Sequence, residues 1–206
     1  MSCNRGESPL ILYSGTIPVL YGGMPGVKGS VGCATTLTMR VFVAGATGFI
    51  GTELVKDLIA GGHHVRGLTR SDAGAEQLNA AGAESHRGNL TDLDSLRSGA
   101  IGMDAVVNLA FNHGDTSKFA QNAADEIKAI EALGSVLEPG KLLVVTSGIG
   151  ITAGAPGQVR KESDPPAESA VMPRWPEQAA QAFAAKGVHV GSFVCRRYMI
   201  RANRGW

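Results

Sequence analysis

Aromatic residues, cysteines and long apolar runs are all scarce in this chain of 206 residues, and each scarcity excludes a class of protein. Phe, Trp and Tyr make up 5% of the sequence, and the three cysteines, Cys3, Cys33 and Cys195, follow no metal-ligand spacing. This argues against a disulfide-stapled secreted scaffold and fits a cytoplasmic, reducing compartment. No apolar run approaches the roughly 20 residues of a membrane-spanning helix, so we expect no membrane partner.

An excess of charge of either sign is also missing. Lys and Arg number 19 against 18 for Asp and Glu, which gives a net charge of +1. Because non-specific binding to polyanions requires a basic field, we expect no nucleic-acid partner. The length, with 44% hydrophobic and 18% charged residues, predicts one globular domain of ordinary size and leaves the oligomeric state open.

The first 38 residues differ in composition from the rest of the chain. They are rich in Gly, Ser and Pro, which predicts a flexible or non-native extension. An apolar stretch over 9–20 has the character of a signal-peptide core, but Pro18 interrupts it and no basic cluster precedes it. Met39 directly precedes a strand pattern, so we expect Met39 to be the natural first residue.

From Met39 to Val194, short β-branched runs alternate with longer helical patterns, which predicts βαβ units and a mainly parallel sheet. The expected strands are 41–44, 64–68, 83–86, 105–109, 142–146 and 188–194. The expected longer helices are 49–60, 117–137 and 176–186. Two short helices are also expected, one capped by Ser71 or Asp72 and one that begins at a capping box formed by Thr91 and Asp94. Right-handed crossovers give the order 3-2-1-4-5-6, an α/β, doubly wound Rossmann fold over 39–194.

A glycine-rich turn lies between the first expected strand and the first expected helix: Gly45-Ala46-Thr47-Gly48-Phe49-Ile50-Gly51. Gly45 permits a tight turn, Gly48 lets the backbone approach a diphosphate, and Gly51 lets the helix pack close to the strand. The helix N-terminus presents free N–H groups and about +0.5 of an elementary charge to an anion. A tight turn without a ligand is the alternative, but the position after a strand and before a helix favours a site for NADP or NAD.

The end of the second strand bears on the choice between the two dinucleotides. In dinucleotide folds a residue about 20 positions after the last glycine contacts the adenosine ribose, and Arg70 and Ser71 lie there. An acidic residue would bond the ribose 2′-hydroxyl, whereas a guanidinium matches a 2′-phosphate. The sequence therefore favours NADP over NAD, with a solvated arginine at a helix start as the alternative.

The segment Val43 to Gly51 resembles the opening of the extended and atypical short-chain dehydrogenase/reductases (SDRs), the group described as NAD-dependent epimerase/dehydratase-like. The similarity covers about 39–194. In that family the residues after strand three contact the adenine, which implies this role for Asn89 and Leu90, although the family more often has Asp in place of Asn89.

The resemblance also implies roles for residues after two further strands. Those after strand four, here Leu109, Ala110 and Phe111, line the cofactor towards the nicotinamide. The family's catalytic serine follows strand five, and Ser147 matches it. A turn-forming serine before Gly148 is the alternative interpretation.

The Tyr-x-x-x-Lys pair of the family is missing, because no tyrosine occurs between Ser147 and Gly187. In the family this pair exchanges a proton with the substrate while hydride moves to or from nicotinamide. Arg174 or Glu177 could take part in proton handling, but a surface helix start explains both equally well. His113 follows strand four, at the edge where ligands bind, and is a candidate for contact with substrate. No spacing supplies three convergent metal donors, so no metal site is expected.

Residues 195–206 are basic and aperiodic where the family continues with R-L-P-P-x-V-Y-G and a substrate-binding domain. We therefore expect an aberrant tail, produced by a one-base shift near Val194, and no substrate domain. Three functions are compatible with the sequence. The first is an NAD(P)-dependent oxidoreductase or epimerase whose intact relatives act on a small carbonyl, hydroxyl or sugar-type substrate. The second is a non-catalytic redox sensor that binds NAD(P), and the third is an inactive truncated product.

Overall fold

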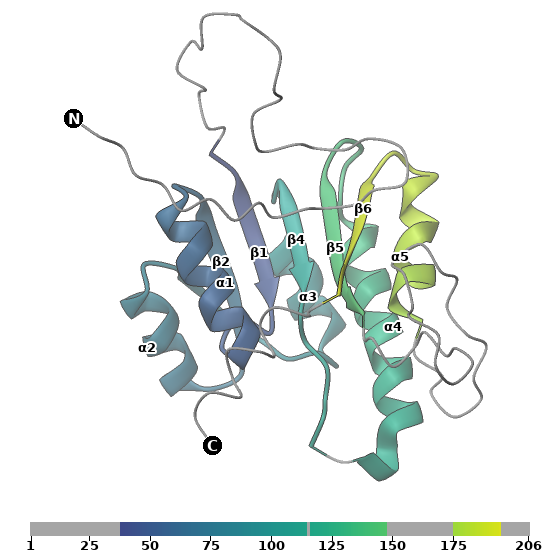
Figure 1. The fold of residues 1–206 in the computed structure, drawn as a ribbon, viewed down its shortest axis with the longest axis horizontal. Helices are drawn as coiled ribbons and strands as arrows, with labels where there is room; N and C mark the ends of the chain where they lie inside the picture. The colour runs from purple at the N-terminus through teal and green to yellow at the C-terminus, as the bar shows by residue number, and fades with distance from the viewer. Residues whose placement is uncertain (1–37, 115, 148–174, 195–206) are drawn as a thin grey trace, which may run out of the picture.

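The structure is a computed structural model and describes residues 38–114, 116–147 and 175–194. Six strands form one parallel sheet in the order β3-β2-β1-β4-β5-β6, the order that the sequence predicts (Figure 1). The strands are β1 (Arg40–Ala44), β2 (His64–Thr69), β3 (Glu84–Arg87), β4 (Ala105–Asn108), β5 (Leu142–Ser147) and β6 (His189–Val194). Residues 1–37 of the expected extension, the loop before α5, Arg174 and the expected tail over 195–206 lie outside the described residues.

Five α-helices and one short 3-10 helix connect the strands in the described part of the chain. They are α1 (Phe49–Ala60), α2 (Asp72–Ala80), α3 (Leu93–Ala100), η1 (Thr116–Lys118), α4 (Phe119–Ser135) and α5 (Pro176–Ala184). Strand ends and the ends of α1, α4 and α5 agree with the sequence prediction to within two residues. No helix among these elements is long and apolar enough to cross a membrane.

The prediction for the N-terminus of α3 was wrong. Asp92, not Thr91, is the N-cap, and its carboxylate accepts a hydrogen bond from the Ser95 N–H at 3.1 Å. The Thr91 hydroxyl instead donates to the side chain of Asn89 at 2.7 Å. The prediction for α2 is confirmed, because Ser71 caps it by accepting from the Gly74 N–H at 3.1 Å.

The helices cover both faces of the sheet and enclose two cores (Figure 1). One core lies under α1 and α2 and includes Val41, Val43, Val55, Val65 and Leu78. The other lies under α3, α4 and α5 and includes Phe42, Leu96, Ile130, Leu143 and Phe183. Because side chains alternate along a strand, β1 contributes to both cores, as its fully apolar run Val41 to Ala44 requires.

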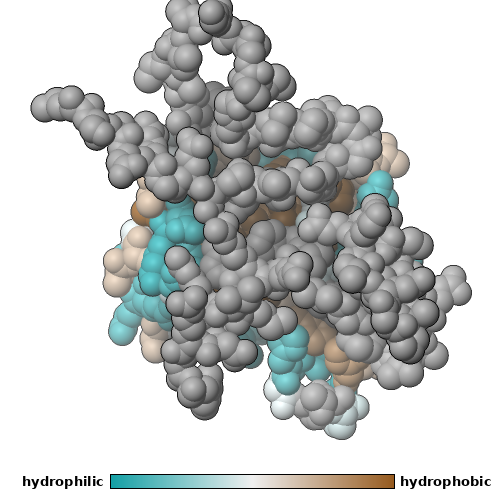
Figure 2. All heavy atoms as spheres, viewed as in Figure 1, coloured by the Kyte–Doolittle hydropathy of each residue, from teal (hydrophilic) through white to brown (hydrophobic). Residues whose placement is uncertain are grey.

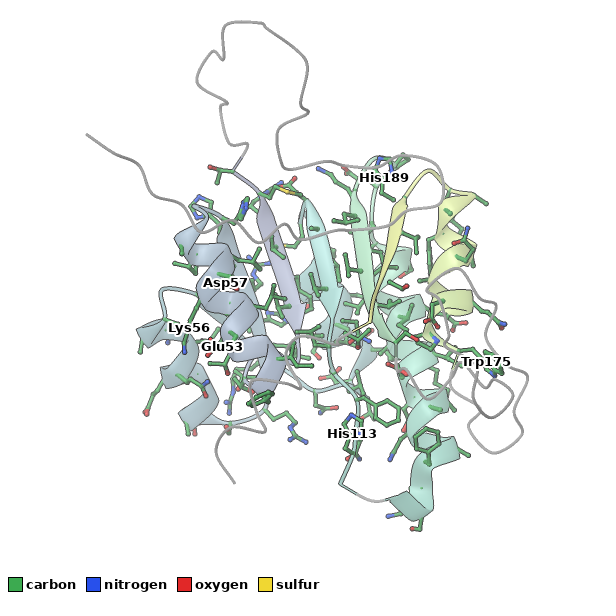
Figure 3. The ribbon with its side chains drawn as sticks, in the orientation of Figure 1. Glu53, Lys56, Asp57, His113, Trp175 and His189 are labelled. Atoms are coloured by element: carbon green, nitrogen blue, oxygen red, sulfur yellow. The ribbon has the colours of Figure 1, made fainter. Side chains whose placement is uncertain are left out.

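The outer face of α1 is hydrophilic (Figure 2). Figure 3 shows Glu53, Lys56 and Asp57 along this helix, and the Lys56 ammonium lies 2.9 Å from the Glu53 carboxylate. The opposite face carries Val55, which is 1% exposed. The helix is therefore amphipathic, and its buried face fixes where its N-terminus meets the end of β1.

At the amino edge of the sheet, Asp104 links three strands. Its carboxylate accepts hydrogen bonds from the Arg40 backbone N–H at 2.9 Å and from the Lys141 ammonium at 2.9 Å. The pKa of this carboxyl lies well below its usual range. The largest cause is the hydrogen bond from the Arg40 backbone, and the hydrogen bonds from the Lys141 and Arg40 side chains follow. This cluster of charges lies at the end of the sheet opposite the glycine turn.

Candidate functional site

The glycine turn closes tightly between β1 and α1. Gly45 has a φ of +82°, a conformation that other residues rarely adopt, and its carbonyl accepts the Gly48 N–H at 3.0 Å. A Cβ at Gly51 would overlap the Gly45 carbonyl oxygen and lie 2.8 Å from the Ala46 Cα. Each of these two positions therefore requires glycine, as the sequence predicts from the spacing.

The N-terminus of α1 is open within the described structure. Its N-cap is Gly48, no side chain caps the helix, and its first turn contains no acidic residue. The first backbone N–H groups of a helix have no partner inside the helix, so an anion placed here would satisfy them. Phe49, at the first position, is 64% exposed, while Ala46 is fully buried and can offer only its backbone to a ligand.

The turn abuts the segment that follows β4. A Cβ at Gly45 would lie 2.9 Å from the Ala110 backbone nitrogen, and β1 pairs with β4 in parallel register. Strand order reverses between β1 and β4, and ligands of doubly wound folds bind at such a switch point. The structure thus brings the predicted turn together with Leu109 and Ala110, whose side chains pack against opposite cores.

Thr47 lies against the start of α2. A Cβ at Gly74 would come within 3.2 Å of both the Thr47 methyl and the Ser71 hydroxyl, and it would overlap the Thr69 hydroxyl. The Ser71 hydroxyl already accepts the cap bond from Gly74. The turn after β1 and the turn after β2 therefore form one corner, with the exposed Arg70 between strand and helix.

A second arginine, which the sequence analysis missed, lies at the same corner. Arg87 ends β3 and pairs with Thr69, the last residue of β2. Its guanidinium lies 3.1 Å from the carboxylate of Asp72, the first residue of α2. The predicted strand order puts these two strand ends side by side, so this order was the signal that could have identified Arg87.

Asn89 organises the loop before α3. Its side-chain oxygen accepts the Thr91 N–H at 2.8 Å and the Asp92 N–H at 3.0 Å. The side-chain oxygen is thus engaged in the loop, which leaves the amide N–H groups of Asn89 for a ligand. Leu90 packs against the core under α3 and α4. The contacts of Asn89 and Leu90 with the adenine stay a prediction.

Buried asparagines hold the segment after β4. Asn108 is fully buried and its side-chain oxygen accepts the Ala110 N–H at 3.3 Å, and Asn122 on α4 donates to the Asn112 carbonyl at 2.9 Å. Glu126, one turn further along α4, is also fully buried. Sequence periodicity missed Asn122 and Glu126 because it counts only apolar side chains on the buried face of α4.

An aromatic cluster lies just beyond β4. The ring of Phe111 is 4.7 Å from the His113 ring and 5.5 Å from the Phe119 ring, measured between centroids. Figure 3 shows His113 past the carboxyl end of β4, next to α4. Because His113 is exposed, its ring is open to a bound molecule on this edge.

Ser147 is half-buried and is the last residue of β5, where it pairs with Val194 of β6. Its neighbour Thr146 donates its hydroxyl to the Asn108 carbonyl at 3.1 Å, which ties the ends of β4 and β5 together. Glu177 lies in the first turn of α5. The sheet thus presents Ser147 at the same carboxyl edge as the glycine turn.

This strand order, the glycines at the switch point and the open helix N-terminus define a dinucleotide-binding protein of the Rossmann type. The chain matches the sequence profile of the NAD(P)H-binding family over residues 45–189 and belongs to that family. Its curated relatives include a 3-dehydrogenase and an epimerase family protein, which confirms the resemblance seen in the sequence.

Individual relatives match part of the chain. An uncharacterised protein of Schizosaccharomyces pombe is 35% identical over 150 residues, which cover 73% of this chain and 50% of that protein. The decarboxylating sterol-4-alpha-carboxylate 3-dehydrogenase of Dictyostelium discoideum is 32% identical over 95 residues, 46% of this chain and 29% of that enzyme. The chain spans about half the length of the first curated relatives it matches.

Among solved structures, the Bordetella bronchiseptica enzyme WbmH in complex with NAD+ superposes with a TM-score of 0.59 at 17% identity. The superposition covers 77% of this chain and 56% of that one. At this identity the likeness concerns the fold. The residues present fit a nicotinamide dinucleotide, because two glycines leave no room for a Cβ at the turn and the amide groups beyond them are uncapped.

Proposed function

We propose that this chain is the dinucleotide-binding part of an NADP-preferring oxidoreductase or epimerase of the SDR type. Its full-length relatives would act on a small carbonyl, hydroxyl or sugar-type substrate. The observation that carries the proposal is the open N-terminus of α1 behind the glycine turn, with Arg70 at the neighbouring corner. The domain would cover residues 39–194.

Each part of the site would have a separate task. The N–H groups of Phe49 and Ile50 would bind the diphosphate, and Arg70 would bind a 2′-phosphate. Bound nicotinamide supplies hydride transfer. Ser147 would hold the substrate oxygen by a hydrogen bond, as the catalytic serine of the family does.

The missing tyrosine favours a second candidate, a non-catalytic dinucleotide sensor. Between Ser147 and Gly187 the sequence holds no phenol that could donate a proton. A sensor needs only the binding corner, whereas an oxidoreductase needs a proton donor as well. The third alternative, an inactive product, predicts that no dinucleotide binds.

Titration of NADP and NAD into the purified chain, with and without Arg70→Ala, tests these alternatives. We expect tighter binding of NADP, and a loss of about 10- to 100-fold in NADP affinity on substitution, because charged hydrogen bonds contribute about 1.5–3 kcal/mol. NAD affinity should change by less than about twofold. Equal affinities for both dinucleotides in the unsubstituted chain would contradict the NADP preference.

A panel of small carbonyl compounds then separates the first two functions. Oxidation of NADPH with any member of the panel favours the oxidoreductase, and tight binding without turnover favours the sensor. If neither dinucleotide binds at millimolar concentration, the chain is an inactive product and both proposals are wrong.

A further inference from the structure

The ends of β2 and β3 place two arginines side by side. Thr69 and Arg87 are Cα partners in parallel register, and the Gly88 N–H donates to the Thr69 carbonyl at 3.1 Å. Pairing therefore continues to the carboxyl edge, where Arg70 follows Thr69 directly. Since neighbouring strands lie about 4.8 Å apart, the backbone of Arg70, one residue beyond the partner of Arg87, lies close to the backbone of Arg87.

The side chain of Arg87 stands on the α2 face of the sheet. A Cβ at Gly67, two residues before Thr69, would meet the Ala46 and Leu78 side chains, so this face is the one under α1 and α2. Residues at alternate positions share a face, and so do residues directly opposite on paired strands. The 3.1 Å ion pair between Arg87 and Asp72 agrees with this, because Asp72 opens α2.

The ion pair is weakly held. The Arg87 and Asp72 side chains are 51% and 93% exposed, and an exposed ion pair contributes little to stability. A phosphate with two negative charges and three acceptor oxygens is a stronger partner for a guanidinium than one solvated carboxylate. Asp72 also places a negative charge beside the position that a 2′-phosphate would take near Arg70, and like charges repel.

From this we infer that Arg87 is a second contact for the 2′-phosphate of NADP and that Asp72 is a resident anion that this phosphate displaces. The inference rests on the proposed dinucleotide binding. Arg70 and Arg87 would hold the phosphate from two strands, while Asp72 lowers NADP affinity and leaves NAD affinity unchanged. The balance between Arg87 and Asp72 thus sets how strongly the site distinguishes the two dinucleotides.

Variants at both positions test the inference, with NADP, NAD and adenosine 2′,5′-bisphosphate as probes in calorimetric titrations. Arg87→Gln should weaken NADP and the bisphosphate by about 10-fold and NAD by less than twofold. Asp72→Asn should strengthen NADP by about 3- to 10-fold, because it removes both the competing carboxylate and the repulsion. Arg87→Lys should give an intermediate loss, because an ammonium keeps the charge without the fork.

A matched control is the exposed ion pair between Asp94 and Arg97 on α3. These groups lie 2.8 Å apart with side chains 96% and 42% exposed, on the opposite face of the sheet. Asp94→Asn and Arg97→Gln should leave all three affinities within twofold. Far-ultraviolet circular dichroism confirms folding for each variant.

The outcomes separate the inference from the function on which it rests. If Arg70→Ala removes NADP preference while Arg87→Gln and Asp72→Asn change nothing, the inference is wrong and the proposed function stands. If Arg87→Gln weakens NAD and NADP equally, Arg87 only supports the start of α2, and the inference is again overturned. If the unsubstituted chain does not prefer NADP, both fail.

Discussion

Gly51 is the residue at which the turn and the first helix come closest. An added Cβ would overlap the Gly45 carbonyl oxygen and approach the Ala46 Cα to 2.8 Å, and both are backbone atoms that cannot rotate away. Helix α1 would have to move away from β1. The same helix presents its amide groups to the diphosphate. Both the packing of α1 against β1 and the binding of the diphosphate therefore require a residue without a Cβ at position 51.

Gly51→Ala should therefore lower the free energy of unfolding by about 1–3 kcal/mol, the usual range for overpacking in a core. The gain of up to 1 kcal/mol that alanine brings to a helix does not offset the overlap. Dinucleotide affinity should fall at least 10-fold. Urea unfolding followed by circular dichroism, and NADP titration below the unfolding midpoint, measure the two effects.

Gly61→Ala, at the other end of α1, is the matched control. Gly61 has a φ of −74°, and the atom nearest to an added Cβ would be Cδ2 of the half-buried His63 side chain at 3.3 Å, with no backbone atom closer than 3.4 Å. This variant should stay within about 0.5 kcal/mol of the unsubstituted protein. If Gly61→Ala lowers the free energy of unfolding as much as Gly51→Ala does, helix α1 tolerates no added methyl group at either end. The effect of Gly51→Ala would then not come from the overlap with the Gly45 carbonyl oxygen.

At the scale of elements, the sequence predicts most of the sheet because parallel strands buried on both faces are runs of apolar residues. Val41 to Ala44 and Leu142 to Val145 show this, and their flanking turns fixed the ends. The cap of α3 was predicted one residue too early, since Thr91 and Asp92 are both good capping residues and the bond to Asn89 decides between them.

The binding corner was predictable only in part. Glycine spacing identifies Gly45 and Gly51 because their constraint is local to one turn. Arg87 and Asp72 come together through the register of β2 and β3, which spacing along the chain does not give. Asn122 is buried for a hydrogen bond to Asn112, a backbone partner that helical periodicity does not reveal.

The amino edge of the sheet carries a pH-dependent link. Asp104 is hydrogen-bonded by the Arg40 backbone and the Lys141 ammonium, which lowers the pKa of its carboxyl in the folded protein. A lowered pKa stabilises the fold above the unfolded value of about 3.9, and this contribution is lost as pH falls below that value towards the folded pKa. The link joins β1, β4 and β5, so its loss loosens the centre of the sheet.

Asp104→Asn should therefore lower the free energy of unfolding at pH 7 by about 1–2 kcal/mol, a range for charged hydrogen bonds that are partly exposed. The difference between the two proteins should stay constant from about pH 7 to pH 5 and shrink below about pH 4. Urea unfolding at a series of pH values measures this. A difference that grows as pH falls would have the wrong sign and would contradict the assignment.

For the molecule as a whole, the sheet couples the two cores. Along β1, Phe42 and Ala44 belong to the core under α3 to α5, while Val41 and Val43 belong to the core under α1 and α2. One strand cannot leave one core and stay in the other, because alternate residues share its backbone. Unfolding of the described sheet and helices should therefore be a single cooperative transition.

NADP should raise the temperature of that single transition, because a ligand that binds only the folded chain adds its binding free energy to stability. At about 100 times Kd this free energy is about 2.7 kcal/mol, which corresponds to a rise in Tm of about 5–11 °C for a chain of this size. Circular dichroism melting with and without NADP measures the shift, and Gly51→Ala should show about half of it or less at the same concentration. Two resolved transitions, only one of which shifts with NADP, would mean that the two cores unfold separately. The dinucleotide site at the β1–β4 switch point would then depend on the folding of one core only.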